Sequence, residues 1–323
     1  MSNAPLAVPE QQPEQQPQQP KQPKRPKPEQ PEPERPKPDR ADVRVIAHRG
    51  ASGTLAEHTL AAYRLAIEQG ADGLECDVRL TADGQLVCVH DRTVDRTSNG
   101  RGVVSALTLE QLSAFDFGSW KSEGSGPEHG SVLTLERLLE LATSCGRRLE
   151  LAIETKHPIR QGGALERALL DLLHRFDLVT PSSGEPTPVR IMSFSQLSLR
   201  RVRALAPTIP TVYLLEYVLP WLRGGRLPYG ARIAGPGIDL VRKDPEYVAA
   251  LRRAGQQVRV WTVDDPADVE LCLRLGVDTI ITNHPRRVLD LLGRGDAGDP
   301  GSAGDGGDGG GPQRSGGPAS QAD

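Results

Sequence analysis

The sequence predicts a (β/α)8 barrel between two tails that lack regular structure. Strand-like and helix-like segments alternate through the middle of the chain, and roughly eight such units in about 250 residues are typical of this barrel. Polar residues directly follow several of the expected strands, where barrels of this class carry their sites. The two ends differ from the middle in composition and have no periodic apolar pattern.

The tails are predicted at residues 1–40 and 293–323, and the barrel at residues 41–292. The first tail holds 12 of the 28 prolines with many glutamines, which is typical of an extended, solvated segment. The second holds 12 of the 34 glycines with Asp and Ser, and predicts a disordered acidic coil. Pro-x-x-Pro spacings in the first tail could bind a partner protein, but its composition favours a solvated spacer.

The first half of the barrel is expected to alternate apolar strands with amphipathic helices. The strands are expected at residues 44–47, 74–80, 86–89 and 149–153. The helices are expected at residues 57–69, 134–142 and 165–175. Asp83-Gly84 predicts a turn between the second and third strands. Residues 91–132 interrupt the alternation with Gly, Ser, Thr and charged residues, which predicts a functional insertion.

The second half continues the same alternation with shorter segments. Its strands are expected at residues 189–194, 211–215, 238–241, 258–263 and 278–281. Its helices are expected at residues 196–205, 246–254 and 267–275. Residues 217–236 are rich in Gly and Pro and are left without an assignment.

Composition argues against several functional classes. The net charge is −3 without a basic block in the core, which disfavours nucleic-acid binding as the main role. The N-terminus lacks the apolar stretch of a signal peptide, and no apolar run has the ~18 residues of a transmembrane helix. The four cysteines are single, and Cys76 and Cys88 lie in apolar strands, as expected of buried thiols. We therefore expect a soluble cytoplasmic protein.

Two acids of the strand at residues 74–80 indicate a metal site. Side chains alternate along a strand, so Glu75 and Asp77 share one face while Leu74 and Val78 share the other. Two buried carboxylates on one face repel each other unless a cation lies between them. Exposed acids on an edge strand are the alternative, but the apolar neighbours disfavour an edge. Oxygen ligands favour Mg²⁺ or Ca²⁺ over zinc.

Two histidines follow apolar strands. His48-Arg49-Gly50 closes the first strand, and His90 follows residues 86–89. A single histidine is more often structural, but two at the ends of different strands can act as general acid and general base. Arg49 could bind a phosphate through its planar guanidinium, and Gly50 could allow a close approach of backbone and ligand.

Residues 149–156 add an acid and a base. Glu154 and Lys156 lie on one face of a strand, where the carboxylate could complete the metal site and the ammonium could bind an anion. A surface ion pair without consequence is the alternative. Trp261 is the least specific candidate, because a lone Trp is more often a core residue than a substrate wall.

Taken in order, these motifs resemble those of the glycerophosphodiester phosphodiesterase family over about residues 45–290. The set that carries the resemblance is His48-Arg49-Gly50, Glu57-His58-Thr59, Glu75-Cys76-Asp77-Val78, His90-Asp91, Glu154-Thr155-Lys156, Val260-Trp261-Thr262 and Gly276 to Asn283. The resemblance implies a (β/α)8 barrel with a small insertion after the second strand, which corresponds to residues 91–132. It also implies metal-dependent hydrolysis of glycerophosphodiesters to glycerol 3-phosphate and an alcohol.

The resemblance also implies a role for each matching residue. His48 and His90 would be the acid/base pair, and Glu75, Asp77 and Glu154 would hold the divalent cation. Arg49 and Lys156 would bind the phosphodiester, Trp261 would line the pocket, and Glu57 would support the site. The attacking group would be water or the neighbouring glycerol hydroxyl, and the sequence leaves both open.

One motif departs from the family pattern. The family usually has Pro-Glu-Asn-Thr where this chain has Ala56-Glu57-His58-Thr59, so an imidazole replaces an amide. We expect the enzyme to remain active with His58.

Two alternatives remain. One is a phosphodiesterase or lyase that acts on lysophospholipids, which an apolar rim formed by Phe115, Phe117 and Trp120 of the insertion would favour. The other is a barrel that only binds, which the retention of both histidines and all three acids disfavours.

Overall fold

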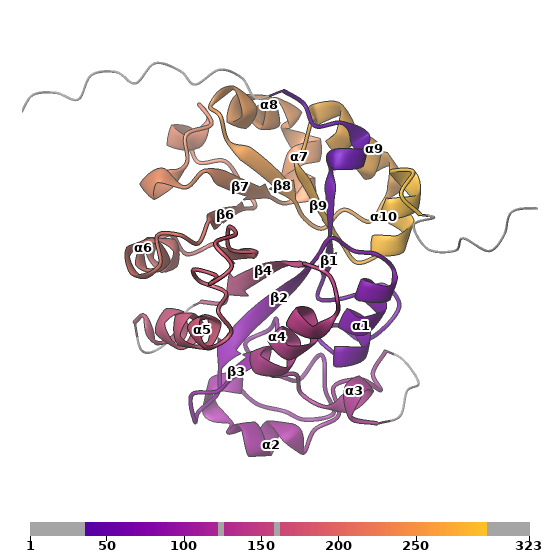
Figure 1. Ribbon diagram of the computed structural model, residues 1–323, viewed down its shortest axis with the longest axis vertical. Coiled ribbons are helices and arrows are strands. Elements are labelled where there is room, and N and C mark those ends of the chain that lie inside the picture. The colour runs from indigo at the N-terminus through magenta and orange to yellow at the C-terminus, as the bar shows by residue number, and fades with distance from the viewer. Residues whose placement is uncertain (1–35, 122–125, 158–161, 296–323) are drawn as a thin grey trace, which may run out of the picture. The chain divides into compact units, whose positions relative to one another are not determined.

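The computed structural model describes residues 36–121, 126–157 and 162–295 (Figure 1). Residues 1–35 and 296–323, which make up most of the two predicted tails, lie outside this range. At its edges, Arg40 forms an ion pair with Glu270 at 2.8 Å, and Arg294 forms one with Asp72 at 2.6 Å. Among the described residues, no helix has both the length and the apolar character needed to cross a membrane.

Eight parallel strands close into a barrel, which confirms the predicted fold class. In chain order these strands are β1 (Arg44–His48), β2 (Gly73–Leu80), β4 (Glu150–Thr155), β5 (Val189–Ser193), β6 (Thr211–Leu215), β7 (Ile233–Pro236), β8 (Gln257–Val260) and β9 (Thr279–Thr282). Strand β1 pairs with both β2 and β9, so the sheet has no open edge within the barrel.

Helices cover the outside of the barrel (Figure 1). They are α1 (Leu60–Glu68), α4 (Leu135–Ser144), α5 (Ala164–Arg175), α6 (Gln196–Leu205), α7 (Ile238–Lys243), α8 (Pro245–Arg253), α9 (Pro266–Leu275) and α10 (Pro285–Leu291). Several begin where a hydroxyl side chain accepts a hydrogen bond from the first turn. Thr59 caps α1, Thr134 caps α4 and Ser195 caps α6 in this way.

The strands bury both of their faces. Outward side chains pack against the helices, and inward side chains fill the barrel interior. The inner apolar cluster consists of Ile46, Ala152, Met192, Val212, Leu214, Ile233 and Ile281. Beside this cluster, Glu150 of β4 forms a buried ion pair with Arg259 of β8, the strand that lies opposite β4 in the barrel order.

The insertion continues from a hairpin on the second barrel strand. Strand β3 (Leu86–Cys88) pairs antiparallel with β2, and η2 (Val104–Ala106), α2 (Leu109–Ser113) and α3 (Pro127–Gly130) follow. The apolar side chains that form the insertion's own small core are Val87, Val89, Val94, Val104, Leu112, Phe117 and Val132. Phe115 packs against this core, so the aromatic residues of the insertion form no continuous exposed rim.

One predicted strand is wrong. Residues 238–241 form the start of helix α7, and the seventh barrel strand is Ile233–Pro236, within the range left unassigned. A segment of four residues is too short to separate strand from helix, and Ile238 and Val241 have the i, i+3 spacing of a helix face. The true strand contains Gly235 because a Cβ there would lie 2.7 Å from Leu214 Cδ2.

The four cysteines are free thiols. Cys76, Cys88 and Cys272 are buried, which confirms the interpretation of the first two as small core residues. Burial raises the pKa of the Cys272 thiol to about 12.

Candidate active site

The predicted site residues gather at the C-terminal end of the barrel. A cavity of about 70 Å³ opens between them. The predicted residues that line it are His48, Arg49, Glu75, His90, Glu154, Lys156 and Trp261. Asp77 and Glu57 contact Arg49, one of these lining residues. All nine predicted residues therefore belong to one connected site.

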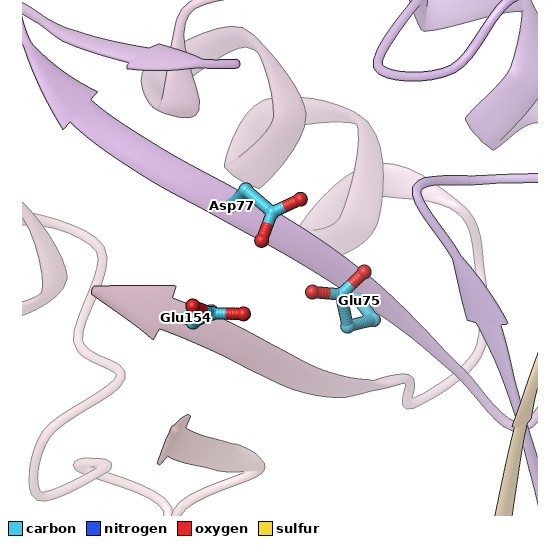
Figure 2. Close-up of side chains that lie close together, drawn as sticks. All are labelled: Glu75, Asp77 and Glu154. Carbon is cyan, nitrogen blue, oxygen red and sulfur yellow. The ribbon is translucent and has the colours of Figure 1, made fainter. Parts of the chain in front are cut away.

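Three carboxylates form the centre of the site. Glu75 and Asp77 lie on β2, and Glu154 lies on the neighbouring strand β4, in register with Asp77 (Figure 2). All three are buried, and one oxygen from each lies within 4.8 Å of the others. Three buried carboxylates at this separation are an oxygen ligand set that fits Mg²⁺ or Ca²⁺.

Burial and neighbouring charges give these three carboxylates different pKa values. Burial and the nearby Asp77 raise the pKa of Glu75 well above its usual range and that of Glu154 to about 8. Burial also acts on Asp77, but Lys156 and Arg49 outweigh it and hold the pKa of Asp77 well below its usual range. Asp77 is therefore the acid whose charge the protein stabilises most.

Two cationic side chains contact the carboxylates. Lys156 Nζ lies 3.0 Å from Asp77 Oδ1 and 2.8 Å from Glu154 Oε1. Arg49 Nε lies 2.9 Å from Asp77 Oδ2, and its Nη1 donates to Glu57 Oε1 at 3.0 Å. Asp77 Oδ1 is buried and, within the described residues, has the Lys156 ion pair but no hydrogen bond. This carboxylate oxygen can therefore bind a further cation.

Gly50 shapes the loop that carries Arg49. Its φ is +83°, and a Cβ there would lie 2.7 Å from the backbone carbon of Ala62 in helix α1. The glycine therefore allows the loop to pack against α1. A close approach of a ligand to the Gly50 backbone stays a prediction.

His48 is oriented by Asn283 and Asp264, neither of which was predicted as a site residue. His48 Nδ1 lies 2.8 Å from Asn283 Oδ1, and Asn283 Nδ2 donates to Asp264 Oδ2 at 2.6 Å. Asp264 thereby fixes the amide, so the neutral imidazole donates from Nδ1 and leaves Nε2 unprotonated. Burial, followed by Arg49, lowers the pKa of His48 to about 4, so the ring is neutral near pH 7. Asn283 and Asp264 follow strands β9 and β8. This position after a barrel strand is the sequence feature that could have identified them as site residues.

His90 reaches the site by way of the hairpin. Because β3 runs antiparallel to β2, it brings His90 back toward the barrel mouth, where Arg79 donates to its carbonyl. His90 Nδ1 lies 2.7 Å from Asp91 Oδ1. Arg96 donates to Asp91 Oδ2 at 2.6 Å.

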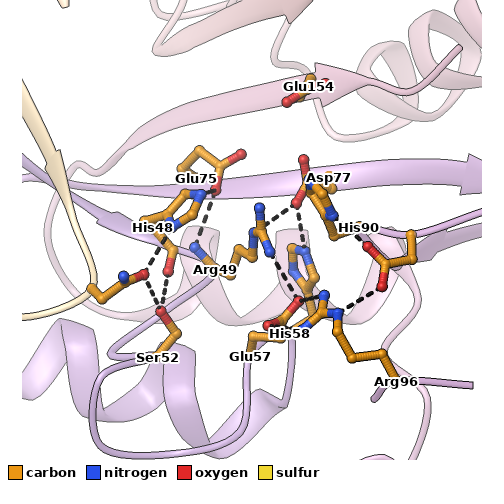
Figure 3. Close-up of polar contacts among 12 residues, drawn as sticks. His48, Arg49, Ser52, Glu57, His58, Glu75, Asp77, His90, Arg96 and Glu154 are labelled. Atoms are coloured by element: carbon orange, nitrogen blue, oxygen red, sulfur yellow. Dashed lines mark hydrogen bonds and ion pairs between the residues drawn. The ribbon is translucent and has the colours of Figure 1, made fainter. Parts of the chain in front are cut away.

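Arg96 also reaches the opposite side of the site (Figure 3). Its two terminal nitrogens each donate to a Glu57 oxygen at 2.8 Å, and Glu57 in turn contacts Arg49. The guanidinium therefore connects the His90 loop to the loop that holds Arg49. Arg96 was not predicted as a site residue because it lies inside the irregular insertion.

His58 lies behind the carboxylates. Its φ is +59°, a conformation in which Asn and His are enriched, which accounts for the exchange between these residue types. His58 Nε2 lies 3.0 Å from Asp77 Oδ2, and Nδ1 lies 2.8 Å from the Tyr63 hydroxyl. Tyr63 donates that hydroxyl to the Glu75 carbonyl at 2.9 Å. The imidazole thus braces the strand that carries two of the acids.

The Trp261 side chain packs inside the barrel and also lines the cavity. Its Nε1 donates to the Gly235 carbonyl at 2.7 Å, and its ring meets Phe194 edge to face at 5.5 Å. The ring packs on the inner apolar cluster while also lining the cavity.

Comparisons with known proteins agree with this geometry. Residues 48–287 match the model of the glycerophosphoryl diester phosphodiesterase family. A Mycobacterium tuberculosis protein described as probable glycerophosphodiester phosphodiesterase 1 is 44% identical over 259 residues, which are 78% of this chain and 93% of that protein. The glycerophosphodiester phosphodiesterase of Bacillus subtilis is 36% identical over 256 residues, which are 77% of this chain and 85% of that protein.

Solved structures show the same fold. The phosphodiesterase of Oleispira antarctica, in complex with the product sn-glycerol-3-phosphate, is similar with a TM-score of 0.67 and 26% identity. The similarity covers 77% of this chain and 96% of that one. A glycerophosphodiester phosphodiesterase of Parabacteroides distasonis has a TM-score of 0.64 and 25% identity, over 78% of this chain and 97% of that one.

Proposed function

The chain belongs to the glycerophosphoryl diester phosphodiesterase family, and we propose that it hydrolyses glycerophosphodiesters with a divalent cation and two histidines. The products are glycerol 3-phosphate and an alcohol. The observation that carries this proposal is the convergence of three buried carboxylates and two histidines around one cavity.

Glu75, Asp77 and Glu154 would hold the cation, which supplies positive charge to the phosphoryl oxygens when bound. Arg49 and Lys156 line the same cavity and bind the phosphodiester. Their charges stabilise the negative charge that develops on the phosphoryl oxygens as the new P–O bond forms.

The histidines move the protons. Neutral His48, held by Asn283 with Nε2 free, accepts the proton of the attacking hydroxyl, which is that of water or of the neighbouring glycerol hydroxyl. His90 acts in its protonated form: Asp91 accepts from Nδ1, and Nε2 donates its proton to the alcohol oxygen as the P–O bond to that alcohol breaks. When the glycerol hydroxyl attacks, water then opens the cyclic phosphate.

The test is release of glycerol 3-phosphate from glycerophosphocholine and glycerophosphoethanolamine, with EDTA, Mg²⁺ and Ca²⁺ arms. We expect release that EDTA abolishes and an added cation restores, and a loss of at least ~100-fold in His48→Ala. Full activity in EDTA would contradict the metal assignment, and an active His48→Ala would contradict the role of the histidine.

One observation favours a lysophospholipid as a second candidate substrate. Tyr217 and Trp221 are 68% and 70% exposed on the segment after β6, next to Glu216, which lines the cavity. Aromatic side chains at this edge could contact an acyl chain. Release of choline from lysophosphatidylcholine that falls in the Tyr217→Ser, Trp221→Ser double variant would support this candidate.

A further inference from the structure

A second cavity adjoins the first. It has a volume of about 310 Å³, within the usual range of small-molecule sites. The residues that line both cavities and form the boundary between them are His90, Glu154, Lys156 and Phe194. The smaller cavity has His48, Arg49 and an apolar floor, whereas the larger one extends on the far side of His90, toward the insertion.

The larger cavity carries an excess of basic side chains. Arg79 and Arg92 line it in addition to Lys156, and its His157 already pairs with Glu166 at 3.4 Å. Its two acids already have cationic partners, because Asp91 pairs with Arg96 and Glu154 pairs with Lys156.

Neither of the two guanidinium groups in this cavity has a carboxylate partner within the described residues. Arg79 donates from Nε and Nη2 to the His90 carbonyl, at 3.1 and 2.6 Å, which satisfies hydrogen bonds without neutralising its charge. Neither Arg79 nor Arg92 forms an ion pair with any carboxylate in the described part of the chain. Like charges that face one cavity repel each other unless an anion lies between them. The cavity therefore suits a negatively charged group.

We infer that this cavity binds the leaving alcohol of the substrate and favours alcohols that carry a phosphate or carboxylate over those that carry a quaternary ammonium. The inference rests on the proposed function, in which His90 protonates the leaving oxygen. His90 lies between the two cavities, so glycerol occupies the smaller one and the leaving alcohol occupies the larger one. Arg92, exposed on the insertion, contacts the anionic group of that alcohol from the rim.

The test compares kcat/KM for three substrates that differ in the leaving alcohol. Glycerophosphoinositol 4-phosphate supplies an anionic alcohol, glycerophosphoglycerol a neutral one and glycerophosphocholine a cationic one. We expect the unmodified enzyme to prefer them in that order. Arg92→Gln should lower kcat/KM for the anionic substrate and raise it for the cationic one, changing their ratio by roughly tenfold, as for one partly screened unit charge. Arg92→Lys should keep the preference.

Arg101→Gln is the matched control. Arg101 lies in the same insertion, is 88% exposed and pairs with Asp95 outside the cavity, so its loss should not change the ratio. An enzyme that prefers the choline substrate, or a ratio unchanged in Arg92→Gln, overturns the inference and leaves the family activity intact. Failure to hydrolyse all three substrates with every cation overturns both the inference and the proposed function.

Discussion

The orientation of His48 depends on a residue that does not line the cavity. Asn283 accepts from His48 Nδ1, and Asp264 holds the amide in the orientation this requires. Without Asn283 the ring can rotate or change tautomer, so fewer molecules present Nε2 to the attacking hydroxyl. We expect Asn283→Ala to lower kcat by ~10- to 100-fold with little change in KM, because outer contacts of this kind orient catalytic groups.

Steady-state kinetics on glycerophosphoethanolamine would measure this effect. Asn283→Asp serves as the comparison, because its carboxylate keeps an acceptor for His48 but places a second negative charge next to Asp264. An unchanged kcat in Asn283→Ala would show that the barrel alone orients His48.

Most of the site was predictable at the residue scale because its members occupy regular positions. Glu75 and Asp77 share a strand face, and His48 is the last residue of a strand, so the alternation of side chains and the position at a strand end identify them. Arg96 follows no such rule. Its role depends on the contact between the loop of residues 91–96 and the loop that holds Arg49. This is a tertiary contact, and no local sequence pattern predicts it.

At the element scale, helix α1 supports the site from its first turn. Thr59 accepts from the Ala62 amide at 3.2 Å and donates to the Ala56 carbonyl at 2.8 Å. Tyr63, one turn later, contacts both His58 and β2. We expect Thr59→Ala to reduce the free energy of unfolding by ~1 kcal/mol, the typical contribution of an N-cap.

Urea unfolding followed by circular dichroism would test the cap. Thr143→Ala is a matched control, because Thr143 is exposed in α4 and its hydroxyl donates to the Leu139 and Glu140 carbonyls of the same helix. That substitution should change the free energy of unfolding by less than ~0.5 kcal/mol. Equal effects of the two substitutions would contradict a capping role for Thr59.

Elements with a long apolar period were predictable, and short ones were not. Helix α5, for example, spans Ala164–Arg175 against a prediction of 165–175. Strand Ile233–Pro236 contains a glycine and a proline, residues that normally weaken a strand. It forms because its backbone pairs with β6 on one side and β8 on the other. These pairings cannot be predicted from the local sequence.

At the scale of the whole molecule, a buried ion pair joins opposite walls of the barrel. Glu150 of β4 and Arg259 of β8 are each about 3% exposed and contact each other across the interior. Glu150→Ala would leave the Arg259 charge buried without its partner. We expect a loss of ~3–5 kcal/mol in the free energy of unfolding, since breaking a buried pair costs far more than breaking an exposed one.

Chemical denaturation of the single and double variants would measure this effect. Glu150→Ala with Arg259→Met should recover part of the loss, because the buried Arg259 charge is removed together with its partner and only the half-exposed Arg44 loses a contact. Glu128→Ala, which breaks the exposed pair with Arg64, should cost less than ~1 kcal/mol. A Glu150→Ala variant as stable as the parent would show that the pair with Arg259 does not stabilise the barrel.

Because His90 follows the hairpin on the insertion, heating should inactivate the enzyme at a lower temperature than it unfolds the barrel. His90 follows a hairpin that packs on the small core of the insertion, whereas His48 and the three acids belong to the closed sheet. A small core with few buried side chains opens at a lower free energy than the main one. On slow heating, turnover should therefore decline reversibly several degrees below the calorimetric transition, so that the working temperature of the enzyme is set by its insertion.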